Sequence, residues 1–489
     1  MDSRIALLGS GIALGLFAVG CGGNEGIDLE PDGSCNAAAL QEELDAAKPG
    51  ETVTIGSCEV AGTLTVPAGV RLRGQGRASS SVTAPEGGPA VVLVPGGPGI
   101  PTALLDVSVS SADGTAGVLA QGAGEVELIQ VDVSAQKGIA VGAESLSNLR
   151  LSGVTLLGPL HDNPGAATLW SDDEQAIPAN VATHGLVLVD VQRAQLDGVS
   201  TEGFVRFGAL LVRSTVEAWA GGMVSGNAGV GMMVVGGEAT VSDVEISGTV
   251  PGKSSLPAYG GLFVSEEAVT QDTALETAGA TVTLSSVTVR DNMGVGLLYA
   301  DGRSFTMAGE QAPDGQDPPE LILGNVFGGL VVVDSSNVSV SDVMVTTTKQ
   351  GTLPLGPQDA MIDGGDGVRL VRSTEGIAFE RVRMTRNERA GLLLDLEDAD
   401  SYASLADSWR GVNVHGNEQN GALCLAAGQM MAPGTGWDID INRGDAATEL
   451  SDQSATNPLA AVGVVGPCNM PAPASVLENG LRAILTAGP

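Results

Sequence analysis

The chain is poor in aromatic and in basic residues. Aromatic side chains make up 3% of its 489 residues, which leaves little bulk for a wide globular core. Lys and Arg total 23 against 58 Asp and Glu, giving a net charge of −35. A field of that sign repels DNA, RNA and anionic lipid surfaces, and also acidic polysaccharides that no metal ion or arginine patch bridges. We therefore expect no nucleic-acid partner.

Glycine is abundant, and a short motif containing it recurs along most of the chain. A β-branched pair precedes an asparagine, and a glycine with a second apolar pair follows shortly after. Examples are 287–298, 382–393 and 412–423. Such self-similarity is typical of a solenoid, in which each unit buries its apolar side against its neighbours. The 70 glycines and 24 prolines fit the frequent turns of such a fold.

The spacing of the repeated glycines indicates the size of one unit. The shortest steps between them are 21 to 24 residues, enough for three short strands and three turns. Period-2 alternation, as in 126–128 and 338–340, supports strands. We predict an all-β solenoid, a parallel β-helix, with some turn asparagines stacked as a ladder. The glycines are Gly117, Gly138, Gly185, Gly208, Gly229, Gly261, Gly296, Gly329, Gly367, Gly391 and Gly421, and the ladder candidates are Asn227, Asn292, Asn325, Asn387 and Asn417.

The N-terminal part of the repeat region has the pattern of a helix followed by short strands. Leu40, Leu44 and Ala47 fall on one helical face within 36–49, and strands are predicted at 51–55, 62–66 and 69–74. The run 38–76 resembles the opening of pectin-lyase-like right-handed parallel β-helices, where an amphipathic helix covers the first coil. The resemblance implies a right-handed parallel β-helix solenoid with a short N-terminal capping helix, here over 36–424. For 425–489 we predict an irregular C-terminal cap, with a strand near 436–441 and a short helix over 477–485.

The first 35 residues have the layout of an exported, lipid-anchored protein. Arg4 precedes an apolar run, 5–16, that is too short to span a membrane as a mature helix. The sequence 18–21 resembles a bacterial lipoprotein box, which implies a signal peptide over 1–20, lipidation of Cys21 and an acidic tether over 21–35. The Cys-Gly-Gly start is similar to envelope lipoproteins of myxobacteria. We expect a monomeric outer-membrane lipoprotein, facing either the periplasm or the cell surface, and held to the membrane through its lipid.

Four cysteines remain after Cys21, an even number that suggests disulfides in an exported chain. Proximity in the sequence favours the pairs Cys35–Cys58 and Cys424–Cys468, one at each end of the repeat region. The chain has no CxxC motif and no Cys/His spacing typical of zinc.

The residue sets of β-helix enzymes that cleave uronic-acid polymers are missing. Asp172-Asp173 stands alone, His184-Gly185 lacks a preceding glycine, and neither Arg-x-Lys nor Trp-x-Asp-His occurs. The strongest basic cluster has six arginines whose side chains could share a face one coil apart, or else pair with Asp and Glu on the surface. Arg383 and Arg386, with His415, are weak catalytic candidates, and Arg369 and Arg381 are candidates for binding an anion. The cluster is Arg369, Arg372, Arg381, Arg383, Arg386 and Arg389.

Calcium and sugar stacking are the other chemistries that the sequence suggests. Asp438, Asp440, Asn442 and Glu449 approach an EF-hand spacing, although the glycine is displaced and the intervening isoleucines alternate as in a strand. A looser calcium candidate is 363–367, and no other cofactor is expected. The indoles that either stack on a sugar or cover a turn are Trp170, Trp219 and Trp409.

Departures from the repeat are therefore the candidates for function. Inserted loops are predicted at 157–182, 249–259, 265–279, 301–319, 346–366 and 395–410, and insertions on a regular rod form its variable face. The favoured function is a non-catalytic cell-envelope protein that presents these loops to a glycan or protein partner. The alternatives are a polysaccharide lyase or glycoside hydrolase with a non-standard site, and a structural envelope component.

Overall fold

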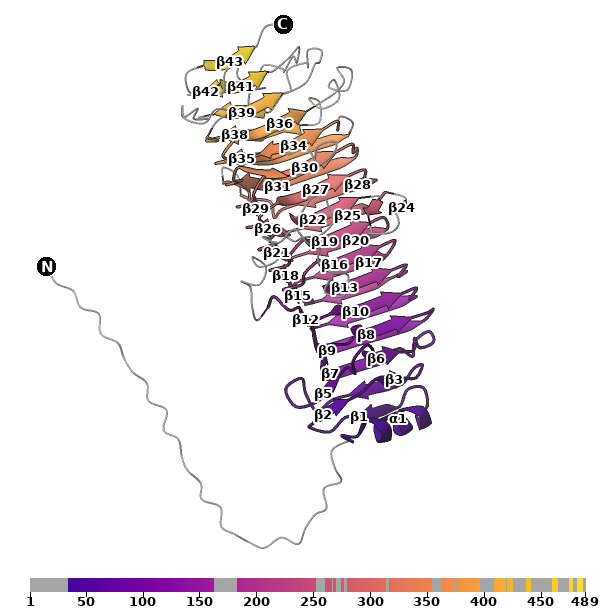
Figure 1. Ribbon diagram of the computed structural model, residues 1–489. Coiled ribbons are helices and arrows are strands. Elements are labelled where there is room, and N and C mark those ends of the chain that lie inside the picture. The colour runs from indigo at the N-terminus through magenta and orange to yellow at the C-terminus, as the bar shows by residue number, and fades with distance from the viewer. Residues whose placement is uncertain are drawn as a thin grey trace, which may run out of the picture.

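The computed structural model shows one long rod of stacked β-strand coils (Figure 1). The structure describes residues 34–161, 183–251, 260–265, 267–269, 274–276, 279–313, 316–353, 362–373, 376–395, 409–418 and 420–424, with four later strands. The colour runs steadily from indigo at α1 (Ala37–Ala46) to yellow at the last strands, so each coil lies on the preceding one.

Each coil between residues 52 and 424 contributes one short strand to each of three parallel faces, as the sequence predicted, and two of these faces join into one sheet of 24 strands. Face A is a separate sheet of fifteen strands. Its strands are β3 (Leu64–Val66), β6 (Pro89–Leu93), β8 (Ala116–Gln121), β10 (Gly138–Glu144), β13 (Thr183–Val189), β16 (Phe207–Val212), β19 (Val230–Val235), β22 (Gly260–Ser265), β27 (Val295–Ala300), β30 (Gly328–Val333), β34 (Asp366–Val371), β36 (Ala390–Asp395), β39 (Asn420–Cys424), β41 (Ala460–Val464) and β43 (Arg482–Thr486).

Face B follows face A in each coil. Its strands are β1 (Thr52–Thr54), β4 (Arg71–Arg73), the first halves of β7 (Thr102–Ser111) and β9 (Glu125–Ala135), β11 (Asn148–Ser152), β14 (Ala194–Asp197), β17 (Thr215–Ala220), β20 (Glu238–Ser242), β25 (Thr281–Ser285), β28 (Ser304–Ala308), the first halves of β31 (Val338–Thr346) and β35 (Ile377–Thr385), and β37 (Trp409–Arg410).

Face C completes the coil. Its strands are β2 (Glu59–Ala61), β5 (Ser81–Thr83), the second halves of β7, β9, β31 and β35, β12 (Thr155–Leu157), β15 (Ser200–Glu202), β18 (Met223–Ser225), β21 (Glu245–Ser247), β26 (Thr288–Arg290), β29 (Glu320–Leu323), β38 (Val412–His415), β40 (Trp437–Asp440) and β42 (Ser475–Leu477).

Faces B and C join because the corner between them needs only one residue. Asp106, Gln130, Asp342 and Arg381 take that position within the four long strands β7, β9, β31 and β35, with φ between 52° and 55°. A single residue in the left-handed region turns the chain while the strand pairing continues on both sides. All four corner residues are polar, and Asp342, which is 6% exposed, is paired with Arg381 of the next coil.

The repeat length is 23 residues where no insert interrupts it. Ala116 pairs with Ile139, and Phe207 pairs with Val230. The predicted steps of 21 residues, to Gly138 and to Gly229, are therefore wrong by two residues. The glycine of β19 that lies in register with Gly208 is Gly231. Gly138 is the first residue of β10, and Gly229 directly precedes β19.

The predicted asparagine ladder forms in the turn between face C and face A. Asn292, Asn325, Asn387 and Asn417 are fully buried. The amide Nδ2 of Asn292 donates to Oδ1 of Asn325 at 2.8 Å, and Asn387 donates in the same way to Asn417. A Cβ on Gly296 would lie 2.5 Å from Nδ2 of Asn325. Glycine and asparagine therefore recur together because the amide occupies the space of the missing side chain.

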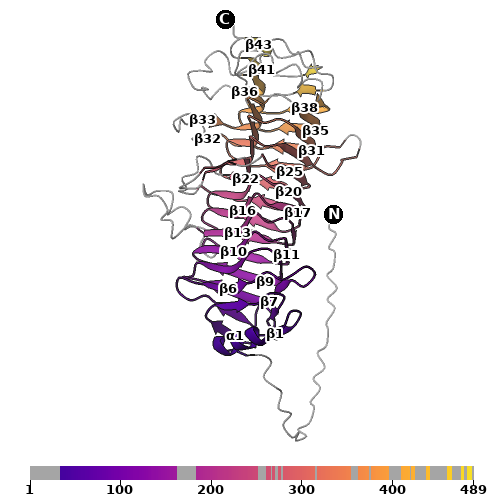
Figure 2. The same cartoon turned by 90° about the vertical axis from the view of Figure 1, so that its right-hand side faces the viewer.

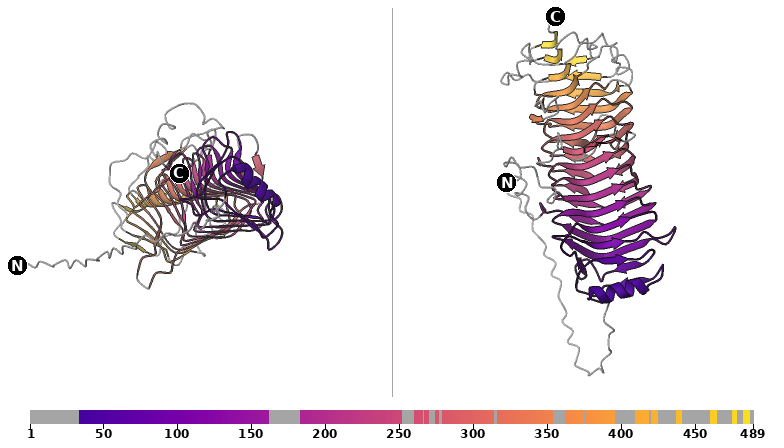
Figure 3. Two further views of the ribbon diagram at one scale, coloured as in Figure 1. Left: turned by 90° about the horizontal axis from the view of Figure 1, so that it is seen from below. Right: turned by 45° about the vertical axis from the view of Figure 1, so that its right-hand side comes forward.

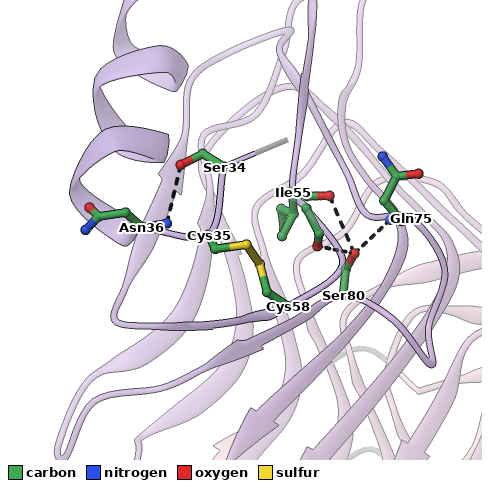
Figure 4. The surroundings of a disulfide bond; sticks show 8 residues. Ser34, Cys35, Asn36, Ile55, Cys58, Gln75 and Ser80 are labelled. Atoms are coloured by element: carbon green, nitrogen blue, oxygen red, sulfur yellow. Dashed lines mark hydrogen bonds between the residues drawn. A yellow bond between two sulfur atoms is a disulfide. The ribbon is translucent and has the colours of Figure 1, made fainter. Parts of the chain in front are cut away.

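The N-terminal end is closed by α1 and by a disulfide, both as predicted. The Asn36 side chain accepts hydrogen bonds from the first turn of α1, and Leu40 and Leu44 are buried over the first coil. Cys35 and Cys58 are bonded, 23 residues apart, beside the buried Ser80 hydroxyl, which donates to the Gly56 carbonyl (Figure 4). Figure 3 shows the helix across the end of the rod.

Removal of this disulfide is expected to loosen α1. In the Cys35→Ser/Cys58→Ser variant, the closed loop of 23 residues is lost, which costs about 3 kcal/mol in the chain-entropy model. Limited proteolysis within 36–58 measures the effect, with untreated and reduced wild-type protein as controls. Equal cleavage rates for the variant and the oxidised wild-type protein would contradict the prediction.

Parallel stacking continues beyond Cys424. β40 and β42 extend face C, while β41 and β43 extend face A. The predicted strand near 436–441 is confirmed. The short helix predicted over 477–485 is wrong, since β43 occupies Arg482–Thr486.

Candidate functional site

The six clustered arginines do not assemble into one basic surface. Arg369 lies on face A, Arg383 lies on face C, and Arg372, Arg381 and Arg386 lie at corners of the coil. Each contacts an acid or an aromatic ring contributed by another part of the rod. The contacts are Arg372 with Asp334, Arg381 with Asp342 and Glu380, Arg383 with Asp317, Arg386 with Glu320, Arg389 with Asp366, and Arg369 over the Phe327 ring.

These contacts give the arginines a structural role between coils. Asp342 binds Arg381 through both carboxylate oxygens, at 2.6 and 2.8 Å. The hydrogen bonds that Arg381 donates to Asp342 and then to Glu380 hold the pKa of this guanidinium above its ordinary value, so it stays protonated. The alternative that the sequence left open, pairing with the abundant acids, is the arrangement found.

Two of the indoles proposed to stack on sugars lie in the core instead. Trp409 is 3% exposed, and its ring packs 5.2 Å from that of Phe379. Its Nε1 donates to the Ile377 carbonyl. Trp219 is fully buried. The prediction that these rings bind sugar is wrong, because both strands turn the indole inward.

One acid of the looser calcium candidate, 363–367, is already paired within the protein. Asp366, the second acid of 363–367, is buried and paired with Arg389, so it is not available as a calcium ligand. In the described part of the chain, no three His, Cys, Asp or Glu side chains come together as a metal site. At the other position, Asp438 and Asp440 belong to strand β40, and their side chains are outside the described residues.

Several predicted residues cannot be compared with the structure. His415 is the last residue of β38, in register with Thr385 and Asp440, and Cys424 ends β39. Their side chains are outside the described residues. The same holds for Cys21, Trp170, Asn442, Glu449 and Cys468 altogether. The described ranges contain no helix that is long and apolar enough to cross a membrane.

Face A carries an apolar layer on its outer side that the sequence analysis missed. We call the following set the outer apolar layer, and all its members are at most 7% exposed. It comprises Phe207, Val212, Val230, Met233, Val235, Phe263, Val295, Phe327 and Val331. It forms a cluster separate from the main core. The exposed fractions of these side chains are those of a single chain without a partner. The atoms that cover this layer therefore belong to the same chain.

The sequence contains a signal for this layer. Strands of faces B and C alternate, as in β25, whereas β19 reads Val-Gly-Met-Met-Val-Val and is buried at every position. A continuous apolar run is typical of a strand covered on both faces. The alternation in faces B and C drew attention away from these runs.

Inserted segments leave the coil next to this layer. Two predicted loops contain antiparallel hairpins, β23 (Glu267–Val269) with β24 (Ala274–Glu276), and β32 (Gly351–Leu353) with β33 (Ile362–Gly364). Both flank strands of face A, and β32 and β33 project from the side of the rod in Figure 2. Just after β33, the amide of Gly365 donates to the carbonyl of Phe327 at 2.5 Å, so this hairpin ends against the outer apolar layer.

A histidine and an arginine border the N-terminal side of the layer. The His184 ring stacks on Phe207 with centroids 5.3 Å apart, and the Arg206 guanidinium lies 5.4 Å from the same ring. Nδ1 of His184 and Nε of Arg206 are buried without a hydrogen-bond partner among the described residues. Burial, and secondarily the charge of Arg206, lowers the pKa of His184 to about 4.

This histidine should make the protein less stable in mild acid. The unfolded chain takes up the proton near pH 6.5, whereas the folded chain takes it up only near pH 4. The stability from the neutral ring is thus complete above pH 6.5 and is lost as the pH falls towards 4. Relative to His184→Phe, wild-type protein should lose on the order of 2 kcal/mol over this range. Urea unfolding at pH 7 and at pH 4.5 measures this loss. An equal change in the free energy of unfolding of wild-type protein and His184→Phe between the two pH values would contradict the prediction.

Comparison with known proteins supports no closer assignment than the fold. No family model matches the chain, and no curated protein matches it. Among solved structures, the chain is similar to the A-module of the Azotobacter vinelandii mannuronan C-5 epimerase AlgE4, with 11% identity, 94% of this chain and 96% of that chain covered, and a TM-score of 0.38.

Two further solved structures show lower TM-scores. The periplasmic alginate epimerase AlgG double mutant shows 11% identity over 90% of this chain and 84% of that chain, with a TM-score of 0.32. The polygalacturonase of Erwinia carotovora ssp. carotovora shows 9% identity over 93% and 99%, with a TM-score of 0.26. The chain is a right-handed parallel β-helix. Likeness at these identities concerns the fold alone.

Proposed function

We propose that the chain is a non-catalytic cell-envelope protein, lipid-anchored at Cys21, whose β-helix holds inserted segments for binding a polysaccharide or an envelope protein. The observation that carries this proposal is the covered outer side of face A. An isolated solenoid has no need of a second apolar layer, because its coils already bury their inner side against one another. A layer that fixes inserts on a rigid sheet pre-organises them for binding.

The ion pairs of the arginines favour a structural role for these residues over a catalytic one. Arg381, Arg383 and Arg386 each contact a carboxylate on an earlier part of the chain. A lyase base must be able to release its proton, and these ion pairs favour the protonated guanidinium. The acidic surface also favours a partner that is uncharged or positively charged.

Binding and turnover can be tested on the same preparation. We expect retention of a subset of polymers on a glycan array, and no rise in unsaturated product on alginate or polygalacturonate, with or without calcium. Turnover that disappears in Arg383→Ala or Arg386→Ala would replace the proposal with a polysaccharide lyase. No binding and no turnover would leave a structural envelope component.

The anchor is tested separately by fractionation of cells. Wild-type protein should remain with the membranes, and Cys21→Ser should appear in the soluble fraction, because a lipid chain on the cysteine supplies the attachment. Cys35→Ser serves as the matched control, since it changes a cysteine outside the predicted lipoprotein box. Unchanged membrane association of Cys21→Ser would overturn the lipid anchor.

A further inference from the structure

Face B carries a row of hydroxyl groups in register on four successive coils. Thr240 of β20 lies beside Thr283 of β25, which lies beside Thr306 of β28, which lies beside Ser339 of β31. Further hydroxyls flank this row on both sides. We call the set the hydroxyl face, and it comprises Thr240, Ser242, Thr281, Thr283, Ser285, Ser304, Thr306, Ser339 and Ser341.

The backbone aims these side chains outward. In β25 and β28 the alternate residues, such as Val282 and Phe305, are fully or almost fully buried in the main core. The hydroxyl residues between them are exposed or half-buried. Figure 2 shows β17, β20, β25 and β31 following one another along this side of the rod. Neighbouring strands lie about 4.8 Å apart, so the hydroxyls repeat at that distance.

The hydroxyl face is uncharged although the protein is strongly acidic. Glu238 lies at its edge, and Ala308 occupies the remaining position within it. Beyond it, face B again presents charged residues, with Glu217 on β17 and Glu380 on β35. Other exposed strands of face B therefore carry charged residues, which keep the protein soluble. Solubility alone does not account for a neutral area as large as the hydroxyl face.

The hydroxyls of this area are available to a ligand. Within the part of the chain that the structure describes, the members of the hydroxyl face make no side-chain hydrogen bond to the protein. Each hydroxyl can donate one hydrogen bond and accept two. Threonine is restricted at χ1, so Thr240, Thr283 and Thr306 lose little rotamer freedom when they bind.

We propose that the hydroxyl face binds an uncharged polysaccharide chain. Sugar hydroxyls both donate and accept, and so match the chemistry of this surface without a charged partner. Single contacts of this kind are weak, but a polymer that repeats its hydroxyl groups engages several at once. Acidic polymers would meet the −35 net charge, and the nine residues of the hydroxyl face include no arginine to offset it. The inference does not depend on the inserts or on the lipid anchor.

The test is sedimentation with insoluble cellulose and affinity electrophoresis in a soluble neutral glucan, with alginate as the acidic probe. The variant is Thr283→Val/Thr306→Val, which removes two hydroxyls from the central row and keeps the β-branched shape. Its matched control is Thr288→Val, an outward threonine in the same coil but on face C. Far-ultraviolet circular dichroism and the unfolding midpoint check that all three proteins are folded.

We expect retention of wild-type protein and of Thr288→Val by the neutral polymers, and affinity reduced roughly tenfold or more in the double valine variant. Three results would overturn the proposal: no retention of wild-type protein, equal retention of the double variant and the control, or retention by alginate alone. Binding mediated by the inserts would instead persist unchanged in the double variant.

Discussion

Arg389→Met is expected to lower the free energy of unfolding by about 3–5 kcal/mol. Arg389 and Asp366 are paired through both carboxylate oxygens, with side chains 10% and 0% exposed. The pair joins the start of face A in one coil, at β34, to the turn before β36 in the next. Methionine fills much of the same volume but leaves the Asp366 carboxylate buried without its cation. The unpaired buried charge accounts for most of the expected loss in the free energy of unfolding.

The matched control is Arg372→Met. Arg372 also makes a two-point pair with an acid one coil away, Asp334, but these side chains are 39% and 37% exposed. Water then solvates the carboxylate that is left, so the expected loss is about 0–1 kcal/mol. Asp366→Leu/Arg389→Met should recover much of the stability, because no buried charge remains.

Solenoids can unfold in parts, so the readout must be local as well as global. Urea unfolding gives the overall change, and hydrogen exchange over β34 and β36 shows where it occurs. Equal losses for Arg389→Met and Arg372→Met would refute the argument, since burial is the feature that separates the two pairs. A double variant no more stable than Arg389→Met would show that packing, and not the charge, is responsible.

The coil, its three strands and its capping helix could be predicted because they depend on short-range patterns. Alternation places Val282 and Leu284 inside, and Leu40 and Leu44 share one side of a helix. The asparagine ladder was also accessible, since Asn292 and Asn325 occupy equivalent positions in successive repeats. The strands and the ladder recur once in each coil, so each repeat provides the evidence for the next.

Other features depend on where each corner falls, which the pattern fixes poorly. The sequence pattern placed Gly229 in register with Gly208, whereas the structure has Gly231 there. The two glycines were confused because both precede apolar residues. The clustered arginines separate onto different faces because Arg372, Arg381 and Arg386 occupy left-handed corner positions, and such positions have no sequence signature beyond polarity. Trp409 belongs to a strand of two residues, too short for alternation to show which way the indole points.

The outer apolar layer shows a different limit. A short apolar run is compatible with a strand covered on both sides or with a turn into the core. The hydroxyl face was hidden for the opposite reason. Each Ser or Thr is an ordinary outward residue, and the area becomes visible only when the register places Thr240, Thr283 and Thr306 in one row.

Asn325→Ala is expected to destabilise the rod by about 3–5 kcal/mol. Oδ1 of Asn325 accepts from both the backbone amide and Nδ2 of Asn292, at 3.2 and 2.8 Å, and its own Nδ2 donates to the Val289 carbonyl at 3.0 Å. All of these groups are buried. Alanine removes three hydrogen bonds in this buried turn and leaves Nδ2 of Asn292 only its longer bond to the Ile246 carbonyl, at 3.4 Å. Each buried polar atom that loses its partner costs roughly 1–3 kcal/mol.

Two further variants separate this effect from loss of volume. Asn325→Thr keeps much of the side-chain volume but should recover little of the hydrogen bonding. At the equivalent turn position in other coils, the Oγ1 atoms of Thr249 and Thr348 are buried without a hydrogen-bond partner among the described residues. Gln195→Ala, on the exposed outer side of face B, should change stability by no more than about 0.5 kcal/mol. Exchange rates of the amides of β26 and β27 should rise in Asn325→Ala, since the ladder joins the turns beside them. A loss in Asn325→Ala no larger than in Gln195→Ala would mean that the ladder satisfies the turn without stabilising it.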